Sequence, residues 1–206
     1  MALSRFAYVR DFELPDQLLP GTFILLRIDG HAFHKCPTPQ HSHTLQLILA
    51  PHRFTDVHRF AKPNDSRGLE LMDHAAISLM REYPDIVLGF GQSDEYRYPN
   101  STTQLKSVLN CRSPISFLLR KSAVLYNRRR SKLTSILCSH FTSAYVMNWQ
   151  TYFPDTPLSY PPSFDARIVL YPGIREVRDY FSWRQADSAF HLSCDSGWLL
   201  IAYQRT

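Results

Sequence analysis

The chain has 206 residues, 44% of them hydrophobic and 20% charged, which supports one packed domain and excludes a wholly disordered chain. The formal net charge of +5 suits polyanionic partners without identifying them. No apolar run is long enough to span a bilayer, and Met1–Glu13 lacks the apolar core of a signal peptide. Four scattered cysteines without CxxC spacing favour a reducing compartment, so we expect a soluble cytoplasmic protein, with nuclear or mitochondrial residence also open.

Two predicted strands each end near a carboxylate. The aliphatic run Phe23–Ile28 is typical of a buried strand and is followed directly by Asp29 and Gly30. A second run, Ile86–Phe90, leads through a glycine to Asp94. Hard cations such as Mg²⁺ bind carboxylate oxygens, so the two acids could share a metal. The alternative is that Asp29 and Gly30 only form a turn.

The stretch between these strands divides into an irregular segment and a helix. Residues 36–56 are rich in proline and histidine without a helical or strand period, which predicts a surface insertion; the spacing does not support a zinc site. A helix follows, capped by Asn64 or Asp65, and its N-terminus with Lys62 favours an anion, although an ordinary cap would look the same. Its predicted apolar stripe is Leu69, Met72, Ala76, Leu79, Met80 and Tyr83.

A broken hairpin follows the second strand. Residues 91–95 predict a tight connection and Tyr96–Tyr98 the start of the return strand, but strand character resumes only at 116–119. A hairpin strand interrupted by a polar, aperiodic stretch contradicts the local pattern, so residues 98–115 are interpreted as a second insertion.

The densest basic region, Arg128–Lys132, precedes a second helix. Cations are unfavourable at a helix N-terminus, so phosphates would satisfy them better, unless the region is simply a solvated run of charge. The predicted stripe of this helix is Leu133, Ile136, Leu137, Phe141, Ala144, Tyr145 and Trp149. A further strand at 166–171 and a helix at 174–187 follow, and residues 188–206 show no clear partner.

Without the insertions, the predicted order is β-α-β-β-α-β and then a helix. This order predicts an α+β, ferredoxin-like antiparallel sheet with helices on one face. The first strand and the hairpin are central neighbours in such a sheet, so Asp29 and Asp94 would meet at one edge, as the carboxylates of a polymerase palm do. Residues 1–187 would form this catalytic domain, with 188–206 as a divergent tail.

Several stretches resemble the tRNA(His) guanylyltransferases, a family of 3′-to-5′ polymerases. They are residues 1–12, 27–34, 60–65, 91–96, 160–167 and 182–187. The resemblance implies addition of a guanylate to the 5′ end of tRNA(His): ATP activates the 5′-phosphate, the GTP 3′-hydroxyl attacks it, and pyrophosphate is removed. It also implies two Mg²⁺ ions and homo-oligomers.

The resemblance also implies roles for individual residues. Asp29, Asp94 and Glu95 would be catalytic, and Asp29, the Gly30 carbonyl and Asp94 would hold metal. Nucleotide or phosphate contacts would come from Asp29, Gly30, His31, Ala32, Phe33, His34, Lys62, Asn64, Asp65, Ser93, Asp94, Arg129 and Lys132.

The sequence departs from the family at both insertions and after Asp187, where a family motif is replaced. We therefore hypothesise a mis-spliced or C-terminally shortened form that keeps the metal edge. Three other readings stay open: an RNA-recognition module, which stacks bases on sheet aromatics; another palm enzyme acting on free triphosphates; and an inactive form that binds nucleotide only.

Overall fold

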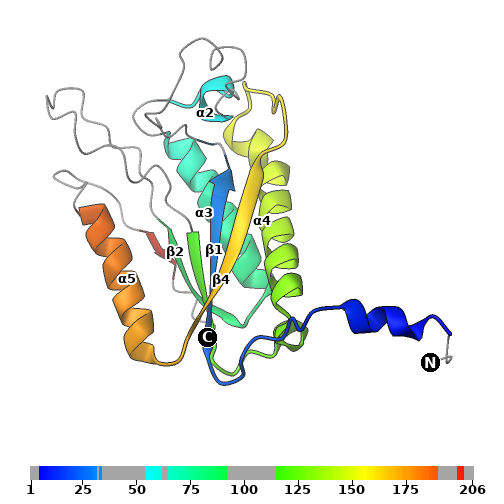
Figure 1. Cartoon of the computed structure of the whole chain (residues 1–206). Coiled ribbons are helices and arrows are strands. Elements are labelled where there is room, and N and C mark those ends of the chain that lie inside the picture. Colours follow the sequence, from blue (N-terminus) through cyan, green and yellow to red (C-terminus); the bar gives the residue numbers. More distant parts are fainter. Residues whose placement is uncertain are drawn as a thin grey trace, which may run out of the picture.

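The computed structural model describes residues 5–31, 33, 54–61, 65–91, 115–189 and 199–201 (Figure 1). The elements in chain order are η1 (Ala7–Phe12), β1 (Phe23–His31), α2 (Phe54–Val57), α3 (Ser66–Glu82), β2 (Ile86–Gly91), β3 (Ile115–Leu119), η2 (Leu125–Arg128), α4 (Arg130–Tyr152), β4 (Ser163–Tyr171), α5 (Ile174–Ala189) and β5 (Leu199–Ile201). Within these described ranges, no helix is long and apolar enough to cross a membrane.

The strands form one sheet in the order β4-β1-β3-β2-β5, and every neighbouring pair is antiparallel. The predicted α+β fold with an antiparallel sheet is confirmed. Because β3 pairs with both β1 and β2, these two strands run in the same direction and end at the same end of the sheet. Residues 199–201, in the stretch for which the sequence indicated no clear partner, pair with β2 as β5.

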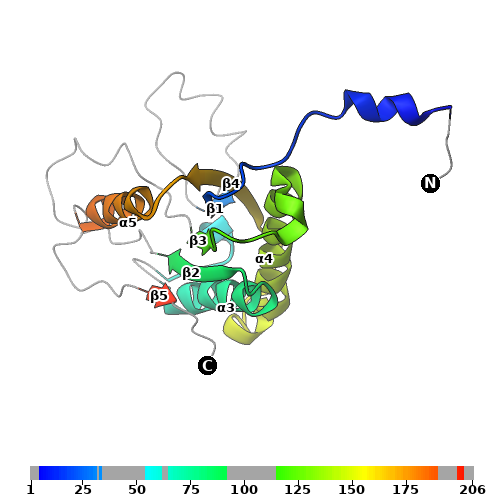
Figure 2. The ribbon, with the colours of Figure 1, turned by 90° about the horizontal axis from the view of Figure 1, so that it is seen from below.

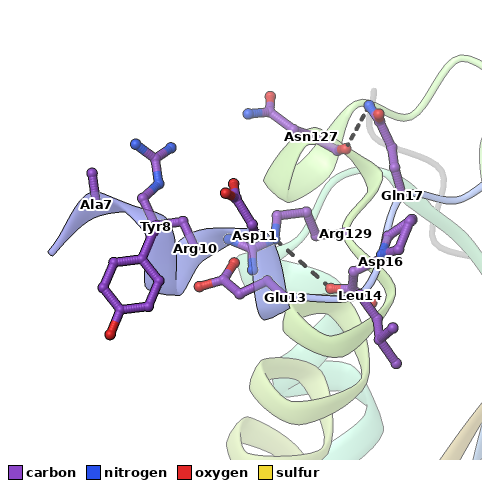
Figure 3. A pocket seen from close by; sticks show the side chains of 11 residues that line it. Ala7, Tyr8, Arg10, Asp11, Glu13, Leu14, Asp16, Gln17, Asn127 and Arg129 are labelled. Atoms are coloured by element: carbon purple, nitrogen blue, oxygen red, sulfur yellow. Dashed lines mark hydrogen bonds and ion pairs between the residues drawn. The ribbon is translucent and has the colours of Figure 1, made fainter.

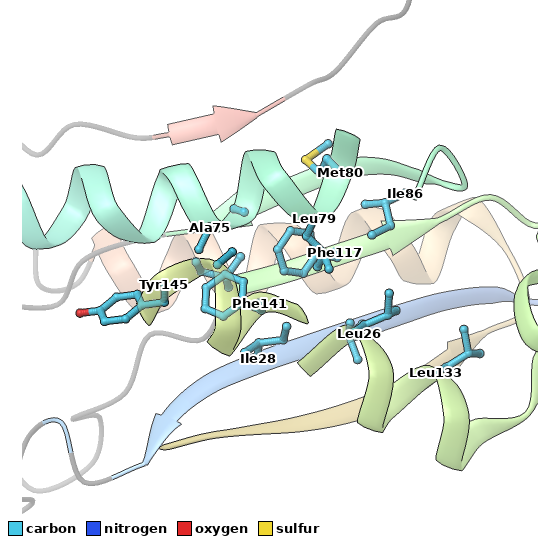
Figure 4. Close-up of a cluster of buried hydrophobic side chains, with 14 of the residues drawn as sticks. Leu26, Ile28, Ala75, Leu79, Met80, Ile86, Phe117, Leu133, Phe141 and Tyr145 are labelled. Carbon is cyan, nitrogen blue, oxygen red and sulfur yellow. The ribbon is translucent and has the colours of Figure 1, made fainter. Parts of the chain in front are cut away.

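The main core lies between the sheet and two helices. Alternate residues of β1, Ile24, Leu26 and Ile28, are buried in one cluster with side chains from α3 and α4. Figure 4 shows these layers meeting around Phe117 of β3 and Phe141 of α4. Phe117 and Phe141 are completely buried, so the centre of this layer is dry.

A third helix, α5, covers the opposite face (Figure 2). Leu25 and Leu118, which alternate with the main-core residues of β1 and β3, pack with Val177 and Tyr180 of α5. The prediction of helices on one face therefore holds for α3 and α4 and is wrong for α5. The physical reason is that the second face of β1 and β3 also carries large apolar side chains, Leu25 and Leu118, which need a cover.

The helical stripes were predicted with unequal success. In α4 the predicted residues are buried except Ile136, which is half-buried. In α3 the predicted Leu69 is 38% exposed, and Gly68 and Leu71 are buried in its place. A Cβ at Gly68 would lie 2.6 Å from the Phe60 ring, so the glycine permits the close contact that sets the rotation of the helix.

Both predicted insertions extend too far toward the domain. Phe54 and Thr55 are buried, and the Phe54 ring stacks on Phe33 with 4.5 Å between ring centroids, so the end of the 36–56 segment belongs to the core. Likewise, Ile115 opens β3 and is buried. Residues 36–53 and 98–114 lie outside the described residues. The strand predicted at 166–171 also begins earlier, since β4 starts at Ser163.

A buried arginine holds the chain before α4. Tyr126, Asn127 and Arg128 all have positive φ, which is costly for residues with a side chain. The Arg128 guanidinium donates hydrogen bonds to the carbonyl oxygens of Ala123 at 3.0 Å, Leu19 at 2.8 Å and Thr22 at 3.0 Å. These bonds connect the segment that leads into β1 with the left-handed turn at 126–128. They therefore offset the backbone strain of that turn.

Replacing Arg128 with Met should therefore destabilise the fold. Three carbonyls, those of Ala123 and Thr22 buried and that of Leu19 partly buried, would lose their donor, at a cost of about 3 kcal/mol. Urea unfolding followed by far-ultraviolet circular dichroism measures this loss. Arg120→Met, at an exposed position in the turn after β3, is the matched control and should leave the midpoint unchanged. Equal midpoints for the two variants would contradict the structural role of Arg128.

Candidate functional site

Asp29 lies near the end of β1, on the face of the sheet that α5 covers. Its neighbours Ile28 and Leu26 belong to the core with α3 and α4, and strand alternation turns Asp29 the other way, on the same face as Arg27. Asp29 is half-buried, and His31 at the end of the strand is exposed. The predicted carboxylate is therefore held by a rigid element and remains within reach of solvent.

The end of β2 lies beside the end of β1, with β3 between them. Ser116 of β3 pairs with Arg27 on one side and with Phe90 on the other, so Gly91 ends β2 level with Ile28. Two strand spacings separate β1 from β2, about 10 Å between backbones. Two carboxylates that follow these ends could therefore approach one cation. Ser93, Asp94 and Glu95 lie outside the described residues, so their convergence with Asp29 stays a prediction.

A second acid faces Asp29 across the sheet. Asp165 of β4 is the direct cross-strand partner of Asp29, and such partners have Cβ atoms about 5 Å apart. Like charges so close are unfavourable, so the pair favours a cation between or above them. Their oxygens are the ligands that Mg²⁺ prefers, and the chemistry of the pair fits that ion. Within the described residues no group of three or more His, Cys, Asp and Glu gathers around a metal position.

Sequence reasoning missed Asp165 as a candidate site residue. It lies in a stretch that carries the family resemblance, but its strand was predicted to begin one residue later. A predicted strand that began before Asp165 would have placed Asp165 and Arg167 on the same face. That pattern would have indicated a charged face of the sheet. Arg167 lies 3.8 Å from the Asp165 carboxylate, and its side chain is 67% exposed.

The loop after β1 is anchored by an aromatic contact. A Cβ at Gly30 would lie 2.6 Å from the Phe33 ring, so only glycine allows that ring to close over the strand. Phe33 packs against Phe54 and Phe164, and its carbonyl accepts a hydrogen bond from Thr55 at 3.0 Å. Phe33 therefore fixes the loop through its side chain. Ala32 and His34 lie outside the described residues, and the nucleotide contacts of the loop stay a prediction.

Asp65, predicted both as a cap and as a phosphate contact, has a structural role here. Its carboxylate caps α3 by accepting from the Arg67 amide at 3.0 Å, and it also accepts from the Ala61 amide and the Arg67 guanidinium. The bond from the Arg67 side chain is the main cause that lowers the Asp65 pKa. The cap is confirmed, and a phosphate contact would have to compete with these bonds. Lys62 and Asn64 lie outside the described residues.

The N-terminus of α4 carries its own anion. The Asp16 carboxylate accepts from the Ser131 amide at 2.9 Å and from the Ser131 hydroxyl, and these bonds lower its pKa. Asp16 also lies 3.8 Å from Arg129. The interpretation that the basic region needs phosphates is therefore wrong for this helix end and for the buried Arg128. Arg129 is half-exposed and Lys132 is exposed, so both remain available to an anion.

A shallow pocket lies between η1 and the start of α4 (Figure 3). Its volume is about 880 Å³, and its lining residues are Ala7, Tyr8, Arg10, Asp11, Glu13, Leu14, Pro15, Asp16, Gln17, Asn127 and Arg129. Arg129 is the only predicted site residue in this lining. The lining includes no residue from the ends of β1 and β2, so this pocket is distinct from the carboxylate edge, which we define as Asp29 and Asp165.

Asp73 of α3 is a carboxyl with a strongly altered pKa outside that edge. Burial, with a smaller contribution from the Glu70 charge, raises its pKa to about 6. Strongly raised pKa values mark functional sites in many proteins, but here no second catalytic group accompanies Asp73 among the described residues. We interpret it as a carboxyl that costs stability once it ionises.

Comparisons with known proteins converge on one family. A family model described as tRNAHis guanylyltransferase matches residues 50–172. The chain is 44% identical over 188 residues to a probable tRNA(His) guanylyltransferase of Dictyostelium discoideum, covering 91% of this chain and 59% of that protein. It is 45% identical over 202 residues to the tRNA(His) guanylyltransferase of Schizosaccharomyces pombe, covering 98% of this chain and 63% of that protein.

Solved structures agree with these sequence matches. The crystal structure of tRNA(His) guanylyltransferase from Saccharomyces cerevisiae superposes with a TM-score of 0.67 at 37% identity, over 89% of this chain and 66% of that one. A bacterial tRNA(His) guanylyltransferase-like protein in complex with ATP shares the fold, with a TM-score of 0.59 at 23% identity, over 87% of this chain and 62% of that one. The chain thus spans between about half and two thirds of the length of the curated relatives it matches.

Asp73→Asn should stabilise the chain above pH 6 and change nothing below pH 4. Between the ordinary value of 3.8 and the folded value of about 6, the folded carboxyl keeps a proton that the unfolded one has lost. Stability therefore falls as pH rises through this window. Discounting for partial exposure, the gain at pH 8 is about 1 kcal/mol. Thermal unfolding of both proteins from pH 4 to pH 8 measures it, and a pH-independent difference would refute the assignment.

Proposed function

We propose, because the chain belongs to the tRNA(His) guanylyltransferase family, that it adds a guanylate to the 5′ end of tRNA(His). ATP would activate the 5′-phosphate, and the 3′-hydroxyl of GTP would then attack it. The observation that carries the proposal is the antiparallel pairing of β3 with both β1 and β2. This pairing brings the end of β1, which carries Asp29, and the end of β2, which precedes Asp94 by three residues, to the same end of the sheet.

The proposed architecture is a ferredoxin-like polymerase palm. The order β-α-β-β-α-β and the central position of β1 and β3 support it. In such a palm, Asp29, the Gly30 carbonyl and Asp94 would hold two Mg²⁺ ions, which supply charge stabilisation to the transferring phosphoryl group. The direct partner Asp165 adds negative charge to the same place, which favours binding of a divalent cation there.

The protein's own residues would bind and orient the substrates. Phosphoryl transfer depends mainly on positioning and on cations near the phosphates. The half-exposed Arg129 and the exposed Lys132 are suitable contacts for triphosphate or RNA phosphates, together with Lys62 and Asn64. The loop from Asp29 to His34, with Ser93, would contact the nucleotide, and the anchored Phe33 would keep that loop in place. Assembly into homo-oligomers is part of the same proposal.

The structure disfavours the alternative that the chain is an RNA-recognition module. Such modules stack bases on aromatic side chains of an open sheet face. Here one face is covered by α3 and α4, and α5 buries Leu25 and Leu118 on the other. The described central strands therefore offer no open aromatic platform, and the carboxylate edge suits transfer chemistry better than base stacking.

Asp29→Asn and Asp94→Asn should each reduce guanylate transfer by roughly 1,000-fold or more, since each removes a charged ligand of the phosphoryl-transfer site. The assay follows labelled GTP into 5′-phosphorylated tRNA(His) in the presence of ATP and Mg²⁺. Asp179→Asn, an exposed acid on α5, is the control and should keep the parent rate. A parent rate in either site variant would exclude the two-metal role of that residue.

A further inference from the structure

Among the residues of α5 up to Arg184, whose burial is described, Arg184 is a buried charged residue on the side of the sheet. Val177, Tyr180 and Arg184 recur at helical spacing and are 2%, 5% and 5% exposed. The first two are ordinary core residues of the α5 face. A buried guanidinium is expensive unless acceptors satisfy it, as carbonyl oxygens do at Arg128. Carboxylates and phosphates are its strongest partners, so we expect one of them at the level of Arg184 on the sheet.

Contacts of α5 fix which part of the sheet Arg184 reaches. Tyr180 and Ser116 share a buried hydrogen bond between their hydroxyl oxygens at 2.6 Å, and Ser116 is paired with Arg27 of β1. One turn earlier, Val177 packs in the cluster that contains Leu25. Successive turns of α5 therefore advance along β1 toward its end.

The next turn brings Arg184 level with Asp29. Four helical residues rise about 6 Å, and two strand residues span about 6.6 Å. Arg184 follows Tyr180 by four residues, and Asp29 follows Arg27 by two, on the same face of β1. Within the part of the chain that the structure describes, the anions at this level are Asp29 and its cross-strand partner Asp165.

We propose that Arg184 is a positioning residue for the carboxylate edge. Its guanidinium balances the Asp29–Asp165 pair from the α5 side and holds the Asp29 carboxylate in one orientation. The other described cations of this face are less suited to that role: Arg167 is largely exposed and lies against Asp165, and Arg27 sits two residues below on β1 itself. This role rests on the proposed function, because it concerns the carboxylate that would hold the metal. Arg184 also belongs to the stretch 182–187, one of those that resemble the guanylyltransferase family.

A double-mutant cycle tests the coupling without substrate or metal. Asp29→Asn should lower the thermal midpoint of the parent chain, because it leaves Arg184 without its full counter-charge. In an Arg184→Gln background the same change should have no effect or raise the midpoint, because it then removes one of two repelling carboxylates. Arg184→Lys keeps the cation and should retain the parent sign. A merely structural Arg184 would give additive shifts.

The matched control is Arg178→Gln, an exposed arginine on the same helix. In that background Asp29→Asn should behave as in the parent chain. Additivity with Arg184→Gln, or the same coupling with Arg178→Gln, overturns the inference. If Arg184→Gln fails to fold, an experimental structure of the parent chain decides: the guanidinium lies within about 6 Å of the Asp29 carboxylate, or the inference is wrong.

The cycle is independent of the transfer assay. It uses no tRNA, GTP or ATP, so absent transfer with intact coupling would overturn the proposed function and leave the positioning role standing. Conversely, transfer at the parent rate in Arg184→Gln, combined with additive midpoints, would overturn the positioning role and leave the proposed function standing.

Discussion

The pairing of β3 with two strands at once is the constraint on which the candidate site depends. Ser116 aligns with Arg27 on one side and Phe90 on the other, and this alignment determines how far β1 and β2 extend beyond the shared core. Because both strands are antiparallel to β3, their ends emerge together. The backbone hydrogen bonds of the sheet therefore fix the relative positions of the two strand ends. A reaction that needs groups from both strands depends on these positions.

Local patterns predicted the parts of this fold that depend on neighbouring residues. The central strands, the α4 stripe and the Asp65 cap all follow from spacing within one segment, and the structure contains them. The carboxylate at the end of β1 was predicted in the same way, from the abrupt end of an aliphatic run. Its cross-strand partner Asp165 was not, since the pairing of β1 with β4 joins residues far apart in the chain.

The errors have a common physical origin in long-range contacts. Asp16 satisfies the amide of Ser131, which is 115 residues away, so the basic segment looked in need of phosphate when its helix end already had a carboxylate. Phe54 sits at the end of an aperiodic stretch, yet its ring packs against Phe33 and Trp149. Leu25 and Leu118 made the sheet two-sided, which no single strand reveals. The sequence shows each of these residues, but it does not show which distant residue each one contacts in the fold.

The buried hydroxyl pair of Ser116 and Tyr180 has a consequence for how the chain folds. A slip of one residue in the pairing of β1 and β3 would move every side chain of the slipped strand to the other face of the sheet. A slipped sheet would leave these two hydroxyls dry and unbonded, at about 1–3 kcal/mol each. The hydrogen bond between Ser116 and Tyr180 therefore makes misaligned sheets less stable than the correctly aligned one during folding. It helps to fix the geometry at the ends of β1 and β2, although neither hydroxyl belongs to the carboxylate edge.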